Sequence, residues 1–240
     1  MTNLSIVIPA RNEAGNILTL IDEIDAAMAG LVPFEIIVVD DGSTDETAAV
    51  VTARIRTLQH LRLIRHDRSG GQSAAVHSGV LAARAPIILT LDGDGQNPPI
   101  ELPKLAAPLL GDATGRIGLV AGQRVGRQDS WSKKIASRLA NGLRGWLLRD
   151  GTRDTGCGLK GFRRDAFLAL PYFDHMHRYL PALFVRDGWA IVHVDVTHRA
   201  RGAGRSNYSN LQRSIVGVPD LLGVVWLNRR RKKVRPVERE

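Results

Sequence analysis

The stretch Ile87-Ile88-Leu89-Thr90-Leu91-Asp92-Gly93-Asp94-Gly95-Gln96 passes directly from an apolar run into two carboxylates and an amide. A short apolar run of this kind predicts a buried β-strand, so the polar side chains stand at its carboxyl end. Hard divalent cations prefer oxygen ligands and are often shared between carboxylates and substrate phosphates. The stretch is therefore typical either of a metal site at a strand end or of a polar turn, because Asp and Gly are also turn formers.

The first half of the chain alternates between strand-like and helix-like segments. Strands are predicted over residues 4–8, 35–39, 61–64 and 87–91, and helices over residues 13–29, 44–58 and 72–83. This order predicts an α/β fold with a mostly parallel, doubly wound sheet and helices on both faces. Ligands of such sheets bind at the carboxyl ends of the strands.

The second half of the chain is less regular. Residues 111–130 are rich in glycine and charge and predict a mobile loop. A long helix, a glycine-rich strand and turn region at 154–162 and a basic tail follow. Since no stretch reads as a linker, we expect one domain over residues 1–228 and a basic C-terminal tail over residues 229–240.

The composition is that of a folded soluble protein, with 44% hydrophobic and 24% charged residues in a chain of 240. One cysteine, Cys157, excludes an internal disulfide and a cysteine-rich zinc site. The first residues lack the basic and apolar pattern of a signal peptide, which disfavours secretion. The formal net charge of +9 indicates an anionic partner: nucleic acid, anionic lipid or a phosphorylated substrate.

Polar clusters follow three of the predicted strands. They are Pro9-Ala10-Arg11-Asn12-Glu13, Asp40-Asp41-Gly42-Ser43 and Asp92-Gly93-Asp94. The carboxyl ends of parallel strands meet at one edge of the sheet, where a nucleotide site is expected. In order and spacing the three clusters resemble the motifs of family 2 glycosyltransferases, which implies a GT-A fold.

The resemblance extends into the second half and narrows there. Asp92-Gly93-Asp94-Gly95-Gln96-Asn97-Pro98-Pro99 is similar to the D-A-D-x-Q-x-P-P motif of polyprenyl-phosphate glycosyltransferases, the dolichol-phosphate mannosyltransferase group. Residues 154–163 resemble that group's D-x-x-S/C-G-F-R segment, and residues 198–208 resemble its H-x-x-R-x-x-G-x-S-K-Y loop. Asn207 stands where this loop usually has lysine.

The resemblance implies an inverting transfer of a hexose from a nucleotide diphosphate sugar to a polyprenyl phosphate, with Mg²⁺ or Mn²⁺ as cofactor. GDP-mannose is the donor it favours, with a UDP-hexose such as UDP-glucose close behind. A phosphate monoester is largely anionic at neutral pH, since its second pKa is about 6. Such an acceptor can attack the anomeric carbon without the general base that a hydroxyl acceptor needs.

The family positions assign roles to individual residues of this chain. The implied nucleotide-sugar-binding residues are Pro9, Ala10, Arg11, Glu13, Asp41, Gln72, Asp92, Gly93 and Asp94. The implied metal ligands are Asp92, Asp94 and Gln96, and the implied acceptor phosphate ligands are Arg124, Lys133, Ser137 and Arg201. Of these, the residues expected to carry catalysis are Asp92, Asp94, Arg124 and Arg201.

Two alternative functions stay open on the sequence. A family 2 glycosyltransferase with a hydroxyl acceptor on a glycan or lipid would need a carboxylate base, for which Asp154 is the obvious candidate. A basic nucleic-acid-binding protein is the alternative from another class, but the chain has no helix-turn-helix or RRM signature, so we expect no nucleic-acid partner. His175 and His177 have the spacing of metal ligands, yet the resembling group has this stretch without a metal.

Two segments suggest contact with an anionic membrane surface. Residues 131–149 predict an amphipathic helix with Trp131 on its apolar face and Lys133, Lys134, Arg138 and Arg144 on the other, although a core-packed helix would show the same pattern. Residues 215–227 are apolar but too few to span a bilayer, and five basic residues follow at 229–233. We expect a cytoplasmic protein, peripheral at the inner face of the membrane, without a transmembrane helix in this chain. Its oligomeric state is open.

Overall fold

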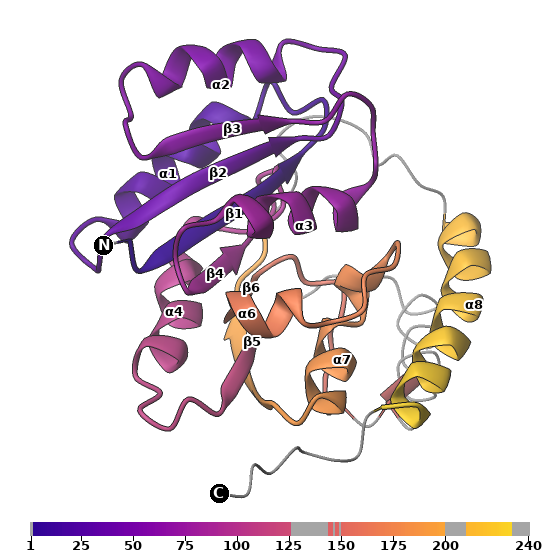
Figure 1. The fold of residues 1–240 in the computed structure, drawn as a ribbon. Helices are drawn as coiled ribbons and strands as arrows, with labels where there is room; N and C mark the ends of the chain where they lie inside the picture. The colour runs from indigo at the N-terminus through magenta and orange to yellow at the C-terminus, as the bar shows by residue number, and fades with distance from the viewer. Residues whose placement is uncertain (1, 126–143, 146, 149, 200–209, 232–240) are drawn as a thin grey trace, which may run out of the picture.

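The computed structural model of the protein describes residues 2–125, 144–145, 147–148, 150–199 and 210–231. Its centre is a seven-stranded sheet with the order β3-β2-β1-β4-β6-β5-β7 (Figure 1). The strands are β1 (Leu4–Ala10), β2 (Phe34–Asp40), β3 (Leu61–Arg65), β4 (Ile87–Thr90), β5 (Ile117–Arg124), β6 (Lys160–Arg163) and β7 (Ala190–Val196).

The first four strands are parallel, as the sequence predicts. The sheet is nevertheless mixed, because β6 lies antiparallel between β4 and β5. β7 then pairs parallel with β5 at the far edge. The predicted mostly parallel α/β sheet is confirmed, and strands from both halves of the chain take part in it.

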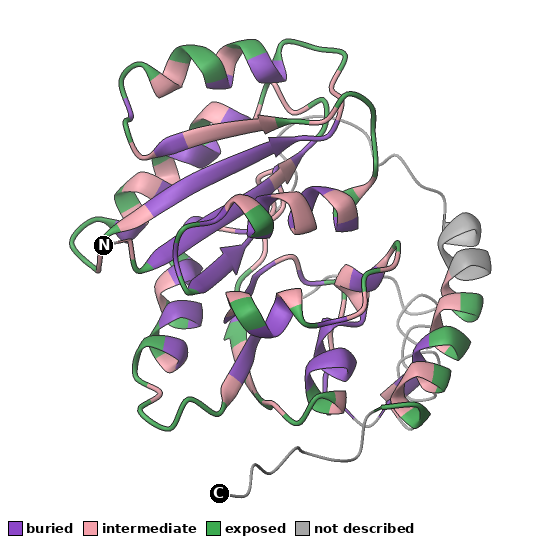
Figure 2. Ribbon diagram, viewed as in Figure 1, coloured by how far each residue is buried: buried purple, intermediate pink, exposed green. Residues whose placement is uncertain are grey.

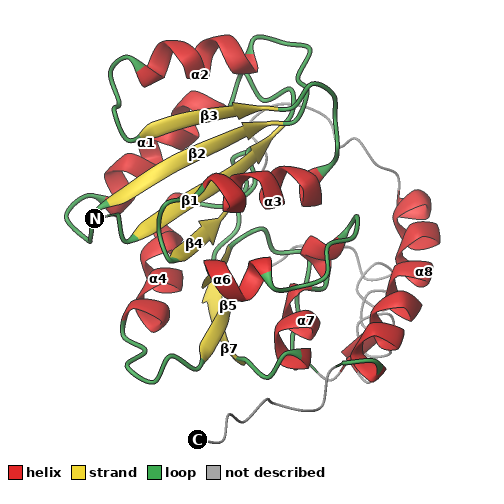
Figure 3. Cartoon of the chain, in the orientation of Figure 1, coloured by secondary structure: helices red, strands yellow, loops and turns green. Residues whose placement is uncertain are grey.

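Helices cover both faces of the sheet, also as predicted (Figure 3). The helices are α1 (Ile17–Met28), α2 (Thr47–Ile55), α3 (Gln72–Ala82), α4 (Leu102–Leu110), α6 (Arg164–Leu168), α7 (Leu180–Arg186) and α8 (Asn210–Arg229), with short 3₁₀ turns at Pro99–Glu101 and Met176–Arg178. All seven predicted elements of the first half are present, with shorter helices than the pattern suggests.

Strand alternation divides the core into two layers. In β1, Ile6 and Ile8 face the cluster built with α1, α2 and α4. Val7 faces the second cluster, which α3, α6, α7 and α8 complete. The central strands are buried on both faces and therefore read as continuous apolar runs (Figure 2). A Cβ at Gly79 of α3 would lie 2.3 Å from a methyl of Val7, so this glycine permits the close approach of α3 to the sheet.

Residues 111–130, expected to include a mobile loop, contain a largely exposed turn at 111–116 and then the buried strand β5. A second expectation is wrong. Arg144, predicted on the solvent or headgroup side of an amphipathic helix, is 8% exposed and pairs with the buried Asp150. The buried carboxylate of Asp150, six residues further along the chain, explains why this arginine points inward. The rest of that predicted helix lies mostly outside the described residues.

The apolar segment 215–227 is part of α8, which runs along one side of the molecule next to α7 (Figure 1). Tyr179 donates its hydroxyl hydrogen to the carbonyl of Gly217 at 3.0 Å, and Arg186 donates to the carbonyl of Leu227 at 3.1 Å. Among the helices that the structure describes, none is long and apolar enough to cross a membrane.

Candidate active site

The acidic motif lies where β4 ends, against the end of β1. Gly93 is buried, and a Cβ built on it would lie 3.0 Å from the carbonyl oxygen of Pro9 and 3.3 Å from Cβ of Ala10. The end of β2 meets the same place, since the amide of Asp41 donates to the carbonyl of Ala10 at 2.9 Å. The structure therefore brings three of the predicted strand-end clusters together at one edge of the sheet.

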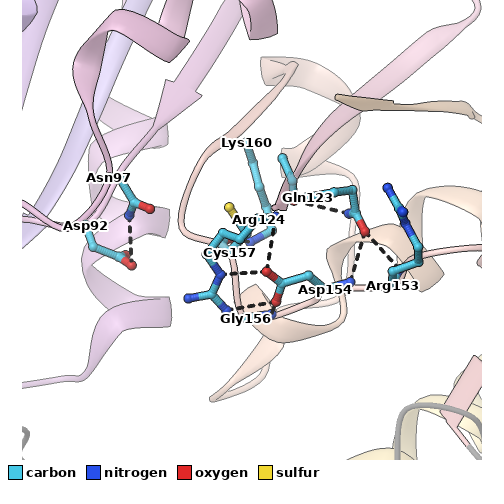
Figure 4. Close-up of polar contacts among 10 residues, drawn as sticks. Asp92, Asn97, Gln123, Arg124, Arg153, Asp154, Gly156, Cys157 and Lys160 are labelled. Carbon is cyan, nitrogen blue, oxygen red and sulfur yellow. Dashed lines mark hydrogen bonds and ion pairs between the residues drawn. The ribbon is translucent and has the colours of Figure 1, made fainter. Parts of the chain in front are cut away.

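Asp92 is the most closely surrounded carboxylate of the motif. Gln72, the first residue of α3, donates its side-chain amide to Oδ1 at 2.7 Å, and Asn97 donates to Oδ2 at 3.4 Å (Figure 4 shows the second contact). Burial and the neighbouring Asp94 raise the pKa of Asp92, while Lys160 and Arg124 oppose that rise. Gln72 was predicted as a donor-site residue, and it contacts the acidic motif directly.

The oxygen atoms at this position fit a divalent cation. The carboxylates of Asp92 and Asp94 repel each other when both are charged, and a bound cation would reduce this repulsion. Oδ1 of Asn97, a buried side chain, finds no hydrogen-bond donor in the part of the chain that the structure describes. No group of three His, Cys, Asp or Glu side chains among those residues could hold a metal alone. Further oxygens, such as those of a substrate diphosphate, would have to complete the coordination.

Asp41 lies 5% exposed beneath the loop that joins β3 to α3. Its carboxylate accepts four hydrogen bonds. The donors are His66 Nδ1 at 2.7 Å, Ser69 Oγ at 2.7 Å, and the backbone amides of Gly70 and Gly71 at 2.8 and 2.9 Å. Burial alone would raise the pKa of Asp41, but these donors hold it below its usual value. A carboxylate has about four acceptor positions, so in this arrangement Asp41 holds the loop that leads into Gln72.

The loops after β1 and β2 are joined by side-chain contacts. Oδ1 of Asn12, whose φ is +55°, accepts from the amide of Thr44 at 2.9 Å, and the amide of Glu13 donates to Thr47 Oγ1 at 2.9 Å. The Glu13 carboxylate accepts from Asn16 at 2.7 Å, while Arg11 is exposed. These contacts explain why α1 begins at Ile17, after the predicted start at residue 13.

Arg124 stands at the end of β5 and forms a bidentate ion pair with Asp154. Its Nε donates to Oδ2 of Asp154 at 2.6 Å and its Nη2 to Oδ1 at 2.8 Å (Figure 4). The neighbouring Gln123, 2% exposed, accepts from the amides of Arg153 and Asp154 at 2.9 and 3.0 Å. The buried amide of Gln123 thus fixes the turn that presents Asp154 to Arg124.

The segment before β6 packs against the side chain of Asp92. A Cβ built on Gly158 would lie 2.3 Å from Oδ2 of Asp92, and Thr90 donates its hydroxyl hydrogen to the carbonyl of Gly158 at 3.0 Å. Lys160 is 6% exposed and donates to the carbonyl of Cys157. Cys157 is buried and without a disulfide partner, as expected, and burial raises the pKa of its thiol.

The predicted acceptor loop starts beside the acidic motif. The amide of Arg199 donates to the carbonyl of Gln96 at 3.0 Å, and its guanidinium contacts the Gly95 carbonyl and pairs with both carboxylate oxygens of Glu23 at 3.0 and 2.7 Å. Two residues further along, Arg201 lies outside the described residues, as do Lys133 and Ser137. Of the four predicted acceptor ligands, only Arg124 therefore has a described position.

The two histidines with metal-ligand spacing lie apart from the acidic motif's carboxylates. Nδ1 of His177 contacts the hydroxyl of Ser73 at 2.8 Å, and His175 faces Asp220 of α8 at 3.4 Å. Burial, with the nearby Lys160, holds the pKa of His177 well below its usual value. The His177 side chain accordingly packs in neutral form beneath the start of α3.

Sequence reasoning missed several residues that build this site. They are Asn97, Gln123, Lys160 and Arg199. Asn97, Lys160 and Arg199 lie inside stretches that carry the family resemblance, so their polar side chains there could have been considered as site residues. Gln123 contacts the amides of Arg153 and Asp154, thirty and thirty-one positions away, and no local pattern marks it.

Comparison with known proteins agrees with this arrangement. Residues 5–170 match the sequence model of glycosyl transferase family 2. The dodecaprenyl-phosphate galacturonate synthase of Rhizobium johnstonii is 36% identical over 240 residues, covering 97% of this chain and 69% of the relative. The undecaprenyl-phosphate 4-deoxy-4-formamido-L-arabinose transferase of Sodalis glossinidius is 34% identical over 208 residues, covering 86% of this chain and 63% of the relative.

A solved structure shares the fold. Glucosyl-3-phosphoglycerate synthase from Mycobacterium tuberculosis, in complex with Mn²⁺, UDP and glucosyl-3-phosphoglycerate, superimposes with a TM-score of 0.71 at 22% identity, covering 95% of this chain and 80% of that one. Another structure of that enzyme contains Mg²⁺ and UDP. The predicted GT-A fold is thereby confirmed. The sequence match over residues 5–170 shows that this chain belongs to glycosyl transferase family 2.

Proposed function

We propose that the protein transfers a sugar, with inversion, from a nucleotide diphosphate sugar to the phosphate of a polyprenyl phosphate. The two relatives described above are named for dodecaprenyl phosphate and undecaprenyl phosphate. The chain spans 69% and 63% of their lengths. The residues of the site are the further support for the proposal.

The observation that carries the proposal is the ion pair between Arg124 and Asp154. A hydroxyl acceptor needs a general base, and Asp154 is the candidate for that role. Both of its carboxylate oxygens accept from the Arg124 guanidinium, at 2.6 and 2.8 Å, and Oδ1 also accepts from the amide of Gly156 at 3.2 Å. A carboxylate held in this way is a poor base. A phosphate acceptor needs no base, which favours polyprenyl phosphate over a hydroxyl acceptor.

The donor would bind at the edge where β1, β2 and β4 end. Asp92 and Asp94 would hold Mg²⁺ or Mn²⁺ together with the diphosphate, with Gln96 as the third predicted ligand. A bound divalent cation supplies positive charge to the departing nucleotide diphosphate. Gln72 and Asn97 orient the Asp92 carboxylate through their amide groups, at 2.7 and 3.4 Å.

The acceptor phosphate would lie between the acidic motif and the arginines. Arg124 is placed at the end of β5, and its guanidinium still offers N–H donors beyond the two that Asp154 takes. Arg201, Lys133 and Ser137 are the further predicted contacts. Arg199 holds the start of the 198–208 loop against Gly95 and Gln96.

Contact with an anionic membrane is the part of the proposal that α8 supports. Val218, Leu222 and Trp226 are 59%, 62% and 59% exposed and stand four residues apart, on one face of the helix. Val224, on the other side, is buried against the core. The arginines at 229–231 are exposed, and the Arg230 guanidinium lies 5.9 Å from the Trp226 ring centre. Apolar side chains next to a basic end are typical of a helix that lies on anionic lipid.

The proposal is tested with a panel of donors and two matched acceptors. GDP-mannose, UDP-glucose, a UDP-uronic acid and UDP-linked aminoarabinose derivatives are incubated with short-chain polyprenyl phosphate or the corresponding polyprenol, with Mg²⁺ or Mn²⁺. Mass spectrometry should show a sugar joined to the phosphate acceptor and none joined to the alcohol, with an Asp94→Asn variant as the inactive control. Transfer to the alcohol but not to the phosphate would overturn the proposal.

A further inference from the structure

Lys160 is a buried cation for which the chemistry above gives no role. It is the first residue of β6 and pairs in register with Thr90 of β4, two residues before Asp92. The side chain is 6% exposed. Burying an ammonium group costs several kcal/mol unless charges or hydrogen bonds compensate for it. The groups around Lys160 that compensate for its buried charge are therefore the ones on which this charge acts.

The surroundings of Lys160 show what that charge acts on. Its Nζ donates to the carbonyl oxygen of Cys157. Burial disfavours its charge, the groups that favour the charge are Cys157, Asp92 and Asp154, and Arg124 is the nearby like charge. Figure 4 shows Arg124, Asp154, Cys157 and Lys160 around the turn before β6, with Asp92 and Asn97 to one side. Arg124 is also engaged by Asp154, whereas no side-chain ion pair is formed by Lys160 in the described part of the chain, so its charge acts on the acidic motif without a partner carboxylate of its own.

The same residue also shapes the surface on which Asp92 rests. The Asp92 carboxylate lies directly on Gly158, where a Cβ would come within 2.3 Å of its oxygen. Gly158 belongs to the turn that Lys160 closes by its hydrogen bond to Cys157, and that Thr90 holds through the carbonyl of Gly158. Lys160 therefore reaches Asp92 in two ways, through its charge and through the backbone of this turn.

We propose that Lys160 is a positioning residue of the donor site, whose buried ammonium holds Asp92 on the Gly158 turn and offsets the negative charge of the bound nucleotide diphosphate. The inference rests on the proposed function in one respect, namely that the donor diphosphate binds at Asp92 and Asp94. Asp92 and Asp94 place two neighbouring carboxylates at this site. The diphosphate brings further negative charge to the same place.

The charge of Lys160 should affect the two ligands of the site in opposite directions. It attracts the diphosphate and repels a divalent cation. Lys160→Met keeps the length and removes the charge, so nucleotide diphosphate affinity should fall roughly tenfold or more. The affinity for Mn²⁺ alone should stay the same or rise. Because the substitution leaves the Cys157 carbonyl without its donor, thermal stability should fall somewhat in Lys160→Met and less in Lys160→Arg.

The experiment compares Lys160→Met and Lys160→Arg with the wild type and with Lys104→Met, a matched change at a lysine whose side chain is 54% exposed. Isothermal titration measures UDP and GDP binding with and without Mn²⁺, electron paramagnetic resonance measures Mn²⁺ binding alone, and calorimetry measures stability. The inference is supported if Lys160→Met loses diphosphate affinity while its Mn²⁺ affinity is unchanged or higher, if Lys160→Arg keeps part of the diphosphate affinity, and if Lys104→Met keeps all of it.

Two results would overturn it. One is wild-type affinity for both diphosphates in Lys160→Met. The other is an equal loss of both ligands together with lower stability, which would make Lys160 only a structural residue. Because these measurements contain no acceptor, they separate the inference from the proposed function. The absence of transfer to polyprenyl phosphate would count against the function and leave the binding result for Lys160 as it stands.

Discussion

Replacing Gly158 by alanine should disable the site without disturbing the fold. An added Cβ would lie 2.3, 2.5 and 2.7 Å from the three carboxylate atoms of Asp92, whereas ordinary contact begins at 3.4 Å. The carboxylate must therefore move by about 1 Å, the difference between 2.3 and 3.4 Å. Asp92 is partly exposed, so its side chain can move away from the turn, and Gly158 does not have a positive φ that would forbid alanine.

The expected effect is a loss of activity at nearly unchanged stability. A misplacement of about 1 Å in a reacting arrangement can cost on the order of 100-fold in rate, which is about 2.7 kcal/mol of transition-state stabilisation. Turnover of the best donor from the panel should fall by that factor in Gly158→Ala. The matched control is Gly223→Ala in α8, where a Cβ meets nothing within 4 Å. That change should leave turnover intact and raise helix stability by about 0.5–1 kcal/mol.

The assay needs two readouts, turnover under saturating donor and the free energy of unfolding in urea. If Gly158→Ala keeps turnover within threefold of the wild type while remaining folded, the position of Asp92 on this turn is not used in the reaction. If Gly158→Ala unfolds, the Asp92 side chain cannot move away from the added methyl group as the geometry requires. Either result would refute the reasoning.

Three further predictions concern the metal, acid stability and the membrane. Asp94→Asn should abolish transfer with the fold intact, since lost electrostatic stabilisation costs a few kcal/mol; full activity of this variant in EDTA would contradict a metal site. Hydrogen bonds from Thr114 and Ile117 hold the pKa of Asp112 far below its usual value. The stability it contributes is therefore fully present above about pH 4 and is lost as the pH falls towards the folded-state pKa. Urea unfolding at pH 5 and pH 3 should accordingly show a smaller pH effect in Asp112→Asn than in the wild type, and an equal effect would count against it. Trp226→Glu, and truncation after Asn228, should each reduce sedimentation with anionic liposomes, and binding should fall as salt rises, since each basic residue near the surface contributes about 1 kcal/mol; Leu81→Glu, at an exposed leucine of α3, is the control that should bind as before.

The sequence predicted the first half of the sheet because each strand there is an apolar run with polar residues at its end. It did not predict β5, and packing explains why. The strand contains Gly118 and Gly122, which weaken any strand pattern. A Cβ at Gly118 would lie 2.5 Å from Cβ of Trp189, and one at Gly122 would lie 2.9 Å from the carbonyl of Leu159. Neighbours that approach from distant parts of the chain require these glycines, so a local pattern could not reveal them.

The grouping of the candidate site residues at one edge of the sheet could also be predicted in part. The resemblance named Asp92, Asp94, Gln72 and Arg124, and the structure places them around one edge of the sheet. It could not show that Arg124 would be engaged by Asp154, since thirty residues separate the two and each could equally have been a solvated surface charge. The direction in which Arg144 points was predicted wrongly for the same reason, because its partner Asp150 is buried only in the folded chain.

In the first half of the chain the candidate site residues follow strands, whereas in the second half Asp154 and Gly158 precede the strand β6. The antiparallel direction of β6 explains this difference. Clusters that follow β1, β2 and β4 meet at the carboxyl ends of these parallel strands. β6 lies next to β4 and runs the opposite way, with Lys160 opposite Thr90 and Arg163 opposite Ile87. The residues that precede β6 therefore reach the same edge, which brings Asp154 and Gly158 to Arg124 and Asp92. A search for site residues in this fold should accordingly look downstream of its parallel strands and upstream of its antiparallel one.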